Sequence, residues 1–181
     1  SFEVLIKEAL ATSVSSVTEE ELGRFKYLSM RKGEAGWMIT YSFENPIVAA
    51  EQGQDADINV VVCQEALDIQ DIAALPQLEY LNLDHTELPE GSLETLSSLK
   101  MITCDYIQLD MLRLALGDAA KGLERLNASH LKSLEALSYF PGLKSLEMED
   151  CREISDISAL AQVKDLENLK LYDMDEVNDF T

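Results

Sequence analysis

Two stretches near the end of the chain repeat one pattern. Residues 143–154 read LKSLEMEDCREI, and residues 166–177 read LENLKLYDMDEV. Both stretches have apolar residues at the same five positions, and the centre of each alternates apolar and polar residues. Such alternation is typical of a short strand with one buried face. Each stretch is therefore predicted to be a strand followed by a turn.

Further copies of this pattern occur upstream. Residues 78–88 read LEYLNLDHTEL, and weaker copies begin at residues 99 and 123, with another around residues 60–67. The second apolar position of the copies is occupied by Val60, Leu81, Ile102, Leu126, Leu146 and Leu169. Successive members lie 20 to 24 residues apart, which is within the period of leucine-rich repeats. We expect strands centred near these residues, and we expect the five members from Leu81 onward to be buried in one column.

The other half of each repeat has a helical character. Residues 71–75 and 156–160 carry the pattern Asp-Ile-x-x-Leu, in which the aspartate can cap a short helix while the apolar residues face inward. One strand and one helical turn per repeat predict an α/β fold, a right-handed leucine-rich-repeat solenoid. Its curved parallel sheet lies inside and its helices lie outside.

The N-terminal part has a different pattern. Residues 2–11 have helical apolar spacing, and Thr18 with Glu21 forms the sequence of a capping box. A strand over residues 26–30 follows, so residues 1–30 are predicted to be a helical N-terminal cap. Within residues 31–57, residues 37–43 have strand composition and residues 51–55 resemble a loop. This segment is either an irregular first repeat or an inserted hairpin, and residues 58–181 form the repeat array of one continuous domain.

These features resemble the bacterial leucine-rich-repeat family that includes internalin-like and clostridial surface proteins. The resemblance rests on residues 2–10, 18–22 and 28, and on the helices at 71–75 and 156–160. The chain departs from the family where Thr86, Cys151 and Met174 replace the asparagine that usually follows the strand. The resemblance implies a protein-binding role, favours the cell surface or secretion, and implies no catalytic residue.

The net charge of the chain limits the classes of partner that it is expected to bind. There are 34 acidic and 14 basic side chains, for a net charge of −20. This charge disfavours nucleic acid and anionic membrane surfaces, and it is consistent with a cationic protein partner or with solubility alone. No apolar run approaches the roughly 18 residues that span a bilayer. We therefore expect a monomer with a protein partner, no nucleic acid and no membrane insertion.

Few residues in the chain are candidates for chemistry. His85 and His130 each follow a predicted strand, with no nucleophile motif beside them. Cys104 and Cys151 fall at inward positions, whereas Cys63 is predicted to project from the concave face. The cysteine spacing fits neither a zinc site nor a disulfide framework. We expect no catalytic, metal or cofactor site, and no disulfide.

The concave face of the sheet is the predicted binding surface, because its side chains are not needed for packing. The candidate partner-binding residues are Tyr80, Asn82, Asp84, Met101, Thr103, Asp105, Arg125, Asn127, Glu147, Glu149, Lys170 and Tyr172. Tyr80, Arg125 and Tyr172 are of the types that often dominate binding energy. The hypothesis is a non-catalytic protein-binding module. The alternatives are a scaffold segment of a longer surface protein, or an enzyme or metal-binding protein that uses the acidic residues.

Overall fold

The computed structural model describes residues 1–84 and 88–174, and it has a mixed α/β fold. Its eight-stranded sheet has the order β3-β2-β1-β4-β5-β6-β7-β8. β1 pairs in parallel with β4, and each later neighbour up to β8 is also parallel. β2 pairs antiparallel with both β1 and β3. The strands are β1 (Tyr27–Gly33), β2 (Gly36–Ser42), β3 (Asn59–Cys63), β4 (Tyr80–Asp84), β5 (Met101–Asp105), β6 (Arg125–Ser129), β7 (Ser145–Glu149) and β8 (Asn168–Tyr172).

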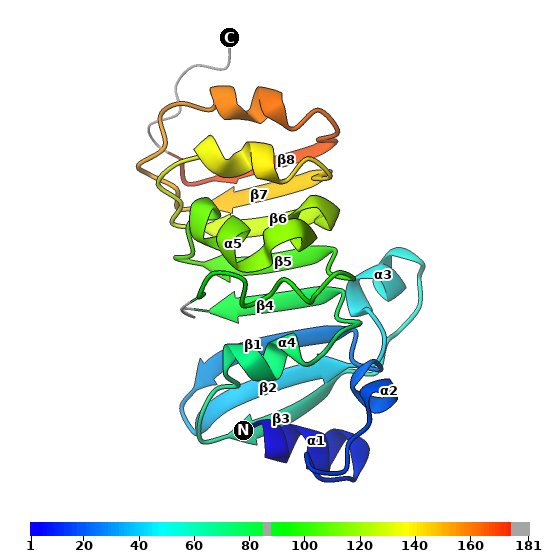
Figure 1. The fold of residues 1–181 in the computed structure, drawn as a ribbon. Helices are drawn as coiled ribbons and strands as arrows, with labels where there is room; N and C mark the ends of the chain where they lie inside the picture. Colours follow the sequence, from blue (N-terminus) through cyan, green and yellow to red (C-terminus); the bar gives the residue numbers. More distant parts are fainter. Residues whose placement is uncertain (85–87, 175–181) are drawn as a thin grey trace.

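Helices cover one face of this sheet (Figure 1). The α-helices are α1 (Phe2–Leu10), α2 (Glu19–Leu22), α3 (Pro46–Glu51), α4 (Ile69–Ala73) and α5 (Leu109–Leu116). The 3-10 helices are η1 (Gly117–Gly122), η2 (Glu135–Tyr139) and η3 (Ser158–Gln162).

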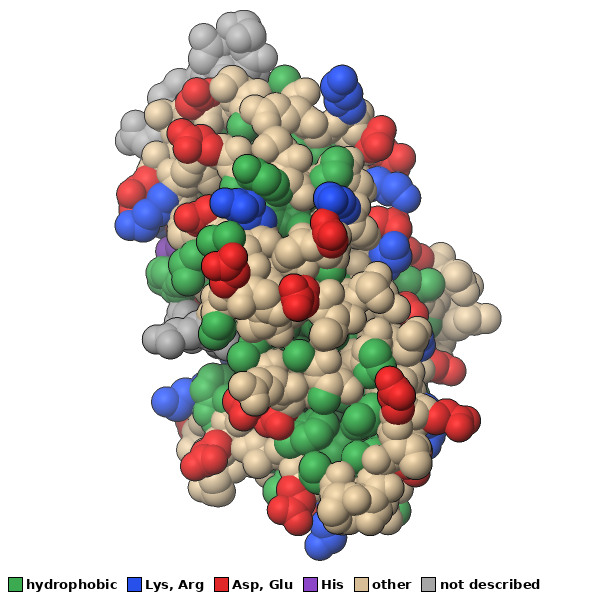
Figure 2. Space-filling model, viewed as in Figure 1, with side chains coloured by type: hydrophobic (Ala, Val, Ile, Leu, Met, Phe, Trp, Pro, Cys, Tyr) green, Lys and Arg blue, Asp and Glu red, His purple; other side chains and the backbone are tan. Residues whose placement is uncertain are grey.

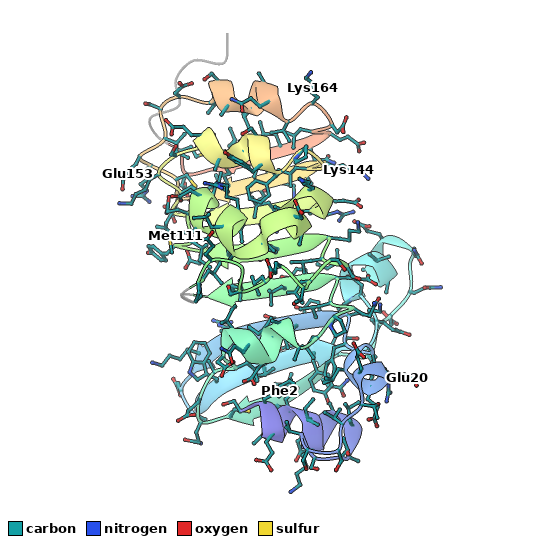
Figure 3. All side chains as sticks on the ribbon, in the orientation of Figure 1. Phe2, Glu20, Met111, Lys144, Glu153 and Lys164 are labelled. Carbon is teal, nitrogen blue, oxygen red and sulfur yellow. The ribbon has the colours of Figure 1, made fainter. Side chains whose placement is uncertain are left out.

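Figure 2 shows this helical face, where acidic and basic side chains are scattered and an apolar area lies between α1 and α4. In Figure 3, Met111 and Glu153 lie toward the C-terminal ends of the strands, and Lys144 and Lys164 lie at the opposite edge.

The predicted column of apolar residues forms across the parallel strands. Leu81, Ile102, Leu126 and Leu146 are paired in register and fully buried. Leu169 continues the register, but its side chain is 41% exposed. Its predicted burial is therefore wrong. The reason is that β8 is the last strand described, and no described helix follows it to cover its inner face.

The strand at residues 59–63 forms, but its predicted place in the parallel array is wrong. β3 pairs antiparallel with β2, which itself forms a hairpin with β1. The two faces of β3 are also opposite to the prediction, because Val60 is 56% exposed while Val61 and Cys63 are buried. Helix α1 lies against β3, and the Cys63 thiol donates to the Ser1 carbonyl oxygen at 3.8 Å. Residues 36–42 thus form the second strand of a hairpin whose first strand is β1.

The N-terminal helices begin where the sequence predicts. α1 covers residues 2–10, and the Thr18 hydroxyl accepts from the Glu21 backbone N–H at 3.2 Å. Glu21 returns the contact by accepting from the Thr18 backbone N–H at 2.9 Å, which completes the capping box. In α4 the predicted cap is displaced: Asp68 is the N-cap residue, and Asp71 occupies the third helical position of a second capping box.

Two side chains bond to the backbone at the turns that follow β5, β6 and β7. Gln108 donates to the His130 carbonyl at 3.0 Å and accepts from the Lys132 backbone N–H at 2.8 Å. The Cys151 sulfur accepts from the Leu131 backbone N–H and donates to the Glu149 carbonyl, both at 3.3 Å. These bonds satisfy backbone groups at the turns that follow the strands, and the one to the Leu131 N–H is buried. Thr86 lies outside the described residues, and no such bond is assigned to Met174.

Candidate functional site

The sheet face opposite the helices carries the candidate site, and we call it the open face. Backbone register places Ser29, Asn82, Thr103, Asn127 and Glu147 in one row across β1, β4, β5, β6 and β7. These side chains alternate with the buried residues along each strand, so they point away from the core. The row follows the predicted concave column and extends it to β1.

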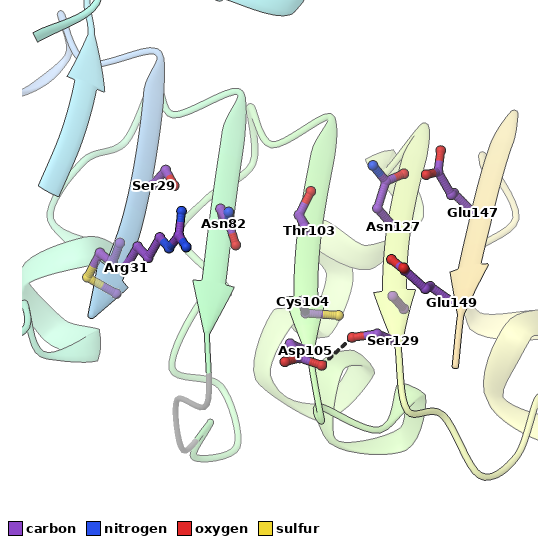
Figure 4. Close-up of a pocket in the computed structure, with 12 residues that line it drawn as sticks. Ser29, Arg31, Asn82, Thr103, Cys104, Asp105, Asn127, Ser129, Glu147 and Glu149 are labelled. Carbon is purple, nitrogen blue, oxygen red and sulfur yellow. Dashed lines mark hydrogen bonds between the residues drawn. The ribbon is translucent and has the colours of Figure 1, made fainter. Parts of the chain in front are cut away.

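A hollow of about 430 Å³ lies over this row (Figure 4). Besides the row, its lining includes Arg31, Asp105, Ser129 and Glu149. Among these side chains three carboxylates face one guanidinium, so the lining has an acidic excess. The hollow is open and its lining surface is about equally polar and apolar, which differs from the closed, mostly apolar cavities that hold small molecules.

Two of the predicted binding residues are largely buried by the protein itself. Tyr80 is 7% exposed and Met101 is 6% exposed. The Tyr80 ring stacks on Tyr27 with ring centroids 4.5 Å apart, and its hydroxyl donates to Thr103 Oγ1 at 3.1 Å. Burial raises the pKa of Tyr80 above its usual value. Tyr80 therefore supports the open face and offers a partner little of its surface.

Arg125 is held by an ion pair with Glu51 at the end of α3. The hydrogen bond from Arg125 lowers the pKa of Glu51, and the same bond raises the pKa of Arg125. A partner must compete with this pair to use the guanidinium. Tyr172, by contrast, is 46% exposed on β8 and remains accessible.

Asp105 organises a small polar cluster at the C-terminal end of β5. Ser129 donates its hydroxyl hydrogen to Asp105 Oδ1, and His130 Nδ1 lies 2.9 Å from the same oxygen. The His130 ring stacks on Tyr106 with centroids 3.8 Å apart. Because the serine donates to the carboxylate and not to the imidazole, this cluster lacks the nucleophile–base contact of a serine hydrolase. His85 lies outside the described residues.

The acidic residues of β7 and β8 have different surroundings. Lys170 donates to Glu147 at 3.1 Å across the two strands. One carboxylate oxygen each from Glu149, Asp150 and Asp173 lies within 4.8 Å of the others. Arg152 donates twice to Asp150, at 2.7 and 3.0 Å. The guanidinium of Arg152 therefore neutralises part of the negative charge of this exposed carboxylate cluster.

Asp84 belongs to β4 and pairs in register with Asp105, but its side chain lies outside the part of the chain that the structure describes. Asn82, Thr103 and Asn127 are half-buried on the open face, and Lys170 is exposed. The predicted residues whose side chains are described thus lie on one face, but they do not form one accessible cluster.

The three cysteines are free and buried. Cys63 faces inward, so its predicted projection from the concave face is wrong, and the inverted faces of β3 are the reason. Burial raises the pKa of Cys104 to about 12. Because the thiolate is the reactive form, Cys104 is unsuited to nucleophilic chemistry at neutral pH.

The sequence reasoning missed open-face residues on β1, β2 and β3. Arg31 is paired in register with Met38, and Met38 with Val62. Met38, Val60 and Val62 are 38%, 56% and 52% exposed. One signal could have revealed them: three successive valines at residues 60–62 must place at least one valine on the exposed face of any edge strand.

Comparisons with known proteins add little to this description. No protein-family model matches the chain, and no curated protein matches it. Among solved structures it is similar to internalin C2 from Listeria monocytogenes, with a TM-score of 0.42 and 22% sequence identity. That match covers 66% of this chain and 56% of the internalin chain. A likeness this distant does not assign the chain to a family.

Among the described residues, no helix is long and apolar enough to span a bilayer.

Proposed function

We propose that the chain is a right-handed leucine-rich-repeat solenoid whose open, concave face binds a protein partner without catalysis. The repeat period of 20 to 24 residues and the register of the column from Leu81 to Leu146 support the solenoid. In this proposal the chain is one continuous domain with a helical cap over residues 1–30. β2 and β3 extend the cap, and the repeats follow from β4.

The half-buried polar side chains at the centre of the open face are the observation that carries the binding role. Asn82, Thr103 and Asn127 lie side by side over a hollow of about 430 Å³, and none of the three fills the core. Leucine-rich repeats stack so that this face is a broad, regular surface. Folding alone does not require its residues, so selection for a partner accounts for them better.

The enzyme alternative and the scaffold alternative each predict a different structural feature. An enzyme needs a reactive group aligned with a base, and in residues 1–84 and 88–174 the Asp105 cluster comes nearest without meeting that need. A scaffold segment needs no binding surface at all, and it predicts that substitutions on the open face change nothing but stability.

One matched pair of substitutions tests the proposal. Asn127→Arg places a long cation in the centre of the open face, and Gln162→Arg adds the same residue at the end of η3 on the helical side. Proteins captured by the wild-type chain are identified by mass spectrometry, and binding is repeated with each purified candidate.

A partner of the open face binds the wild type and the Gln162→Arg variant, and it loses at least about tenfold in affinity for Asn127→Arg, a change of roughly 1.4 kcal/mol. Equal binding to all three proteins contradicts the proposal. Failure of every purified candidate to bind favours the scaffold alternative.

A further inference from the structure

The open face changes in character from one end of the sheet to the other. At the β2–β3 end it carries the apolar side chains of Met38, Val60 and Val62, which the antiparallel register places on the same face. Ile58, two residues before Val60, is 55% exposed. We call these four residues the hairpin patch. Among the described residues, no strand pairs with the outer edge of β3.

Packing does not account for the hairpin patch. The inner face of the same strands is filled separately by Ile39, Val61 and Cys63, all of them buried. Proteins usually protect an edge strand with charged side chains or a covering segment, because an exposed apolar edge promotes unwanted association. β3 instead presents valine at both exposed positions of its centre. Exposed apolar clusters of this kind often mark interaction sites.

The other end of the open face is acidic. Glu147 and Glu149 on β7 line the hollow together with Asp105 on β5, and Arg31 is the basic side chain of that lining. The whole chain carries a net charge of −20. A second copy of the chain would bring the same charge to this surface, whereas a basic segment would be attracted to it.

The distance between the hairpin patch and the acidic end sets the length of chain with which a partner can contact both. From β2 to β7 the sheet order gives five interstrand steps. At about 4.8 Å a step, the separation is roughly 24 Å. An extended chain covers this distance with about seven residues, at roughly 3.3 to 3.6 Å per residue.

We propose that the partner binds through one extended segment that crosses the strands of the open face. Apolar side chains of this segment pack on the hairpin patch, and a lysine or arginine about seven residues away meets Glu149, which lies two residues from the Glu147 that Lys170 already pairs. This inference rests on the proposed protein-binding function and names the chemistry of its partner. Apolar contact with the hairpin patch supplies the affinity, and the acidic end supplies charge selection and speeds association.

Selection from a peptide library tests this chemistry directly. A display library of random fifteen-residue peptides is selected on the immobilised, full chain, and the enriched peptides are synthesised. The proposal predicts peptides with apolar residues and a basic residue spaced by about seven positions, and with few acidic residues. Enriched peptides that are acidic, or that lack apolar residues, would overturn it.

Four variants locate the bound peptides. Val60→Ser combined with Val62→Ser removes apolar surface from the hairpin patch, and Val4→Ser combined with Val14→Ser is the matched control, at positions 42% and 41% exposed elsewhere. We expect the first pair to weaken binding at least about tenfold, because the apolar side chains of the peptide lose the surface on which they pack. The control pair should leave binding unchanged.

Glu149→Gln tests the acidic end, with the exposed Glu20→Gln as its control. Glu149→Gln should weaken binding about two- to fivefold at low salt, and the difference should shrink as salt screens the charge. Glu20→Gln should have no effect.

The outcomes separate this inference from the proposed function. Some peptides could fail to bind the Asn127→Arg variant and still bind the Val60→Ser, Val62→Ser variant and Glu149→Gln as tightly as the wild type. Such peptides contact the open face by other chemistry, and this result overturns the inference alone. Peptides that ignore all three variants overturn the binding role of the open face as well. Sedimentation as a dimer that the Val60→Ser, Val62→Ser variant converts to a monomer would assign the hairpin patch to a second copy and also overturn the inference.

Discussion

Leu146 and Leu169 occupy the same repeat position, but they differ in burial. Leu146 is fully buried in β7, and Leu169 is 41% exposed in β8. Replacing each by alanine removes the same atoms, so the two variants form a matched pair. The difference between them measures how the array is covered at the two places.

The expected costs follow from that exposure. Leu146→Ala removes about three buried carbon groups, worth roughly 2.4 kcal/mol at 0.8 kcal/mol each. The cavity left in the closed core raises the total to about 3–5 kcal/mol. About three fifths of Leu169 is buried, so its transfer cost is roughly 1.5 kcal/mol, with no closed cavity to add.

Urea unfolding of both variants and of the wild type gives the two free energies of unfolding. We expect Leu146→Ala to be the more destabilising by at least about 1 kcal/mol. A cost below about 0.5 kcal/mol for Leu146→Ala would contradict its place in the core. Equal large costs would instead show that the inner face of β8 is covered as well as that of β7.

Three further predictions concern single contacts. Gln108→Ala should cost about 0.5–1.5 kcal/mol in urea unfolding, because the His130 carbonyl and the Lys132 N–H lose their hydrogen-bond partner; the same change at exposed Gln162 should cost less than about 0.5 kcal/mol. Hydrogen bonds from Thr18 hold the pKa of Glu21 below its usual 4.5, so the capping box stabilises the fold above that pH and loses strength as the pH falls through the lowered pKa. Carboxyl NMR titration should show this lowered pKa, with a smaller shift in Thr18→Ala; an unchanged value would disprove the capping contact. Thiol titration without reductant should find three reactive thiols in the unfolded chain, while Cys104 stays unreactive in the native protein because burial raises its pKa to about 12.

The parallel strands were predictable because each repeat encodes them locally. From Leu81 to Leu146 the apolar pairs mark the buried face of every strand, and the register follows their spacing. The capping box at Thr18 is likewise a local pattern with a local outcome.

β3 was not predictable in the same way. Val60, Val61 and Val62 are all apolar, so the alternation that marks a buried face is missing from this strand. Its face is chosen by contacts distant in the sequence, with β2 on one side and α1 over Val61 and Cys63. Contacts between residues distant in the sequence also make two of the predicted binding residues less accessible. Tyr27 covers Tyr80, and Glu51 pairs with Arg125.

The accessible part of the candidate site follows from these distant contacts. The polar row over Asn82, Thr103 and Asn127 could be derived from strand alternation alone. The hairpin patch could not, because its exposure depends on the antiparallel placement of β2 and β3 at the edge of the sheet.

The central claim is that the open face binds the partner, and methyl NMR tests it most directly. Methyl groups of Val60, Val62 and Thr103 report on the open face, and those of Met111 and Leu114 report on exposed positions of α5. On titration with a selected peptide, we predict shift changes for the first three residues and none for the two on α5. Shift changes confined to Met111 and Leu114 would contradict the claim, because they would place the partner on the helical face.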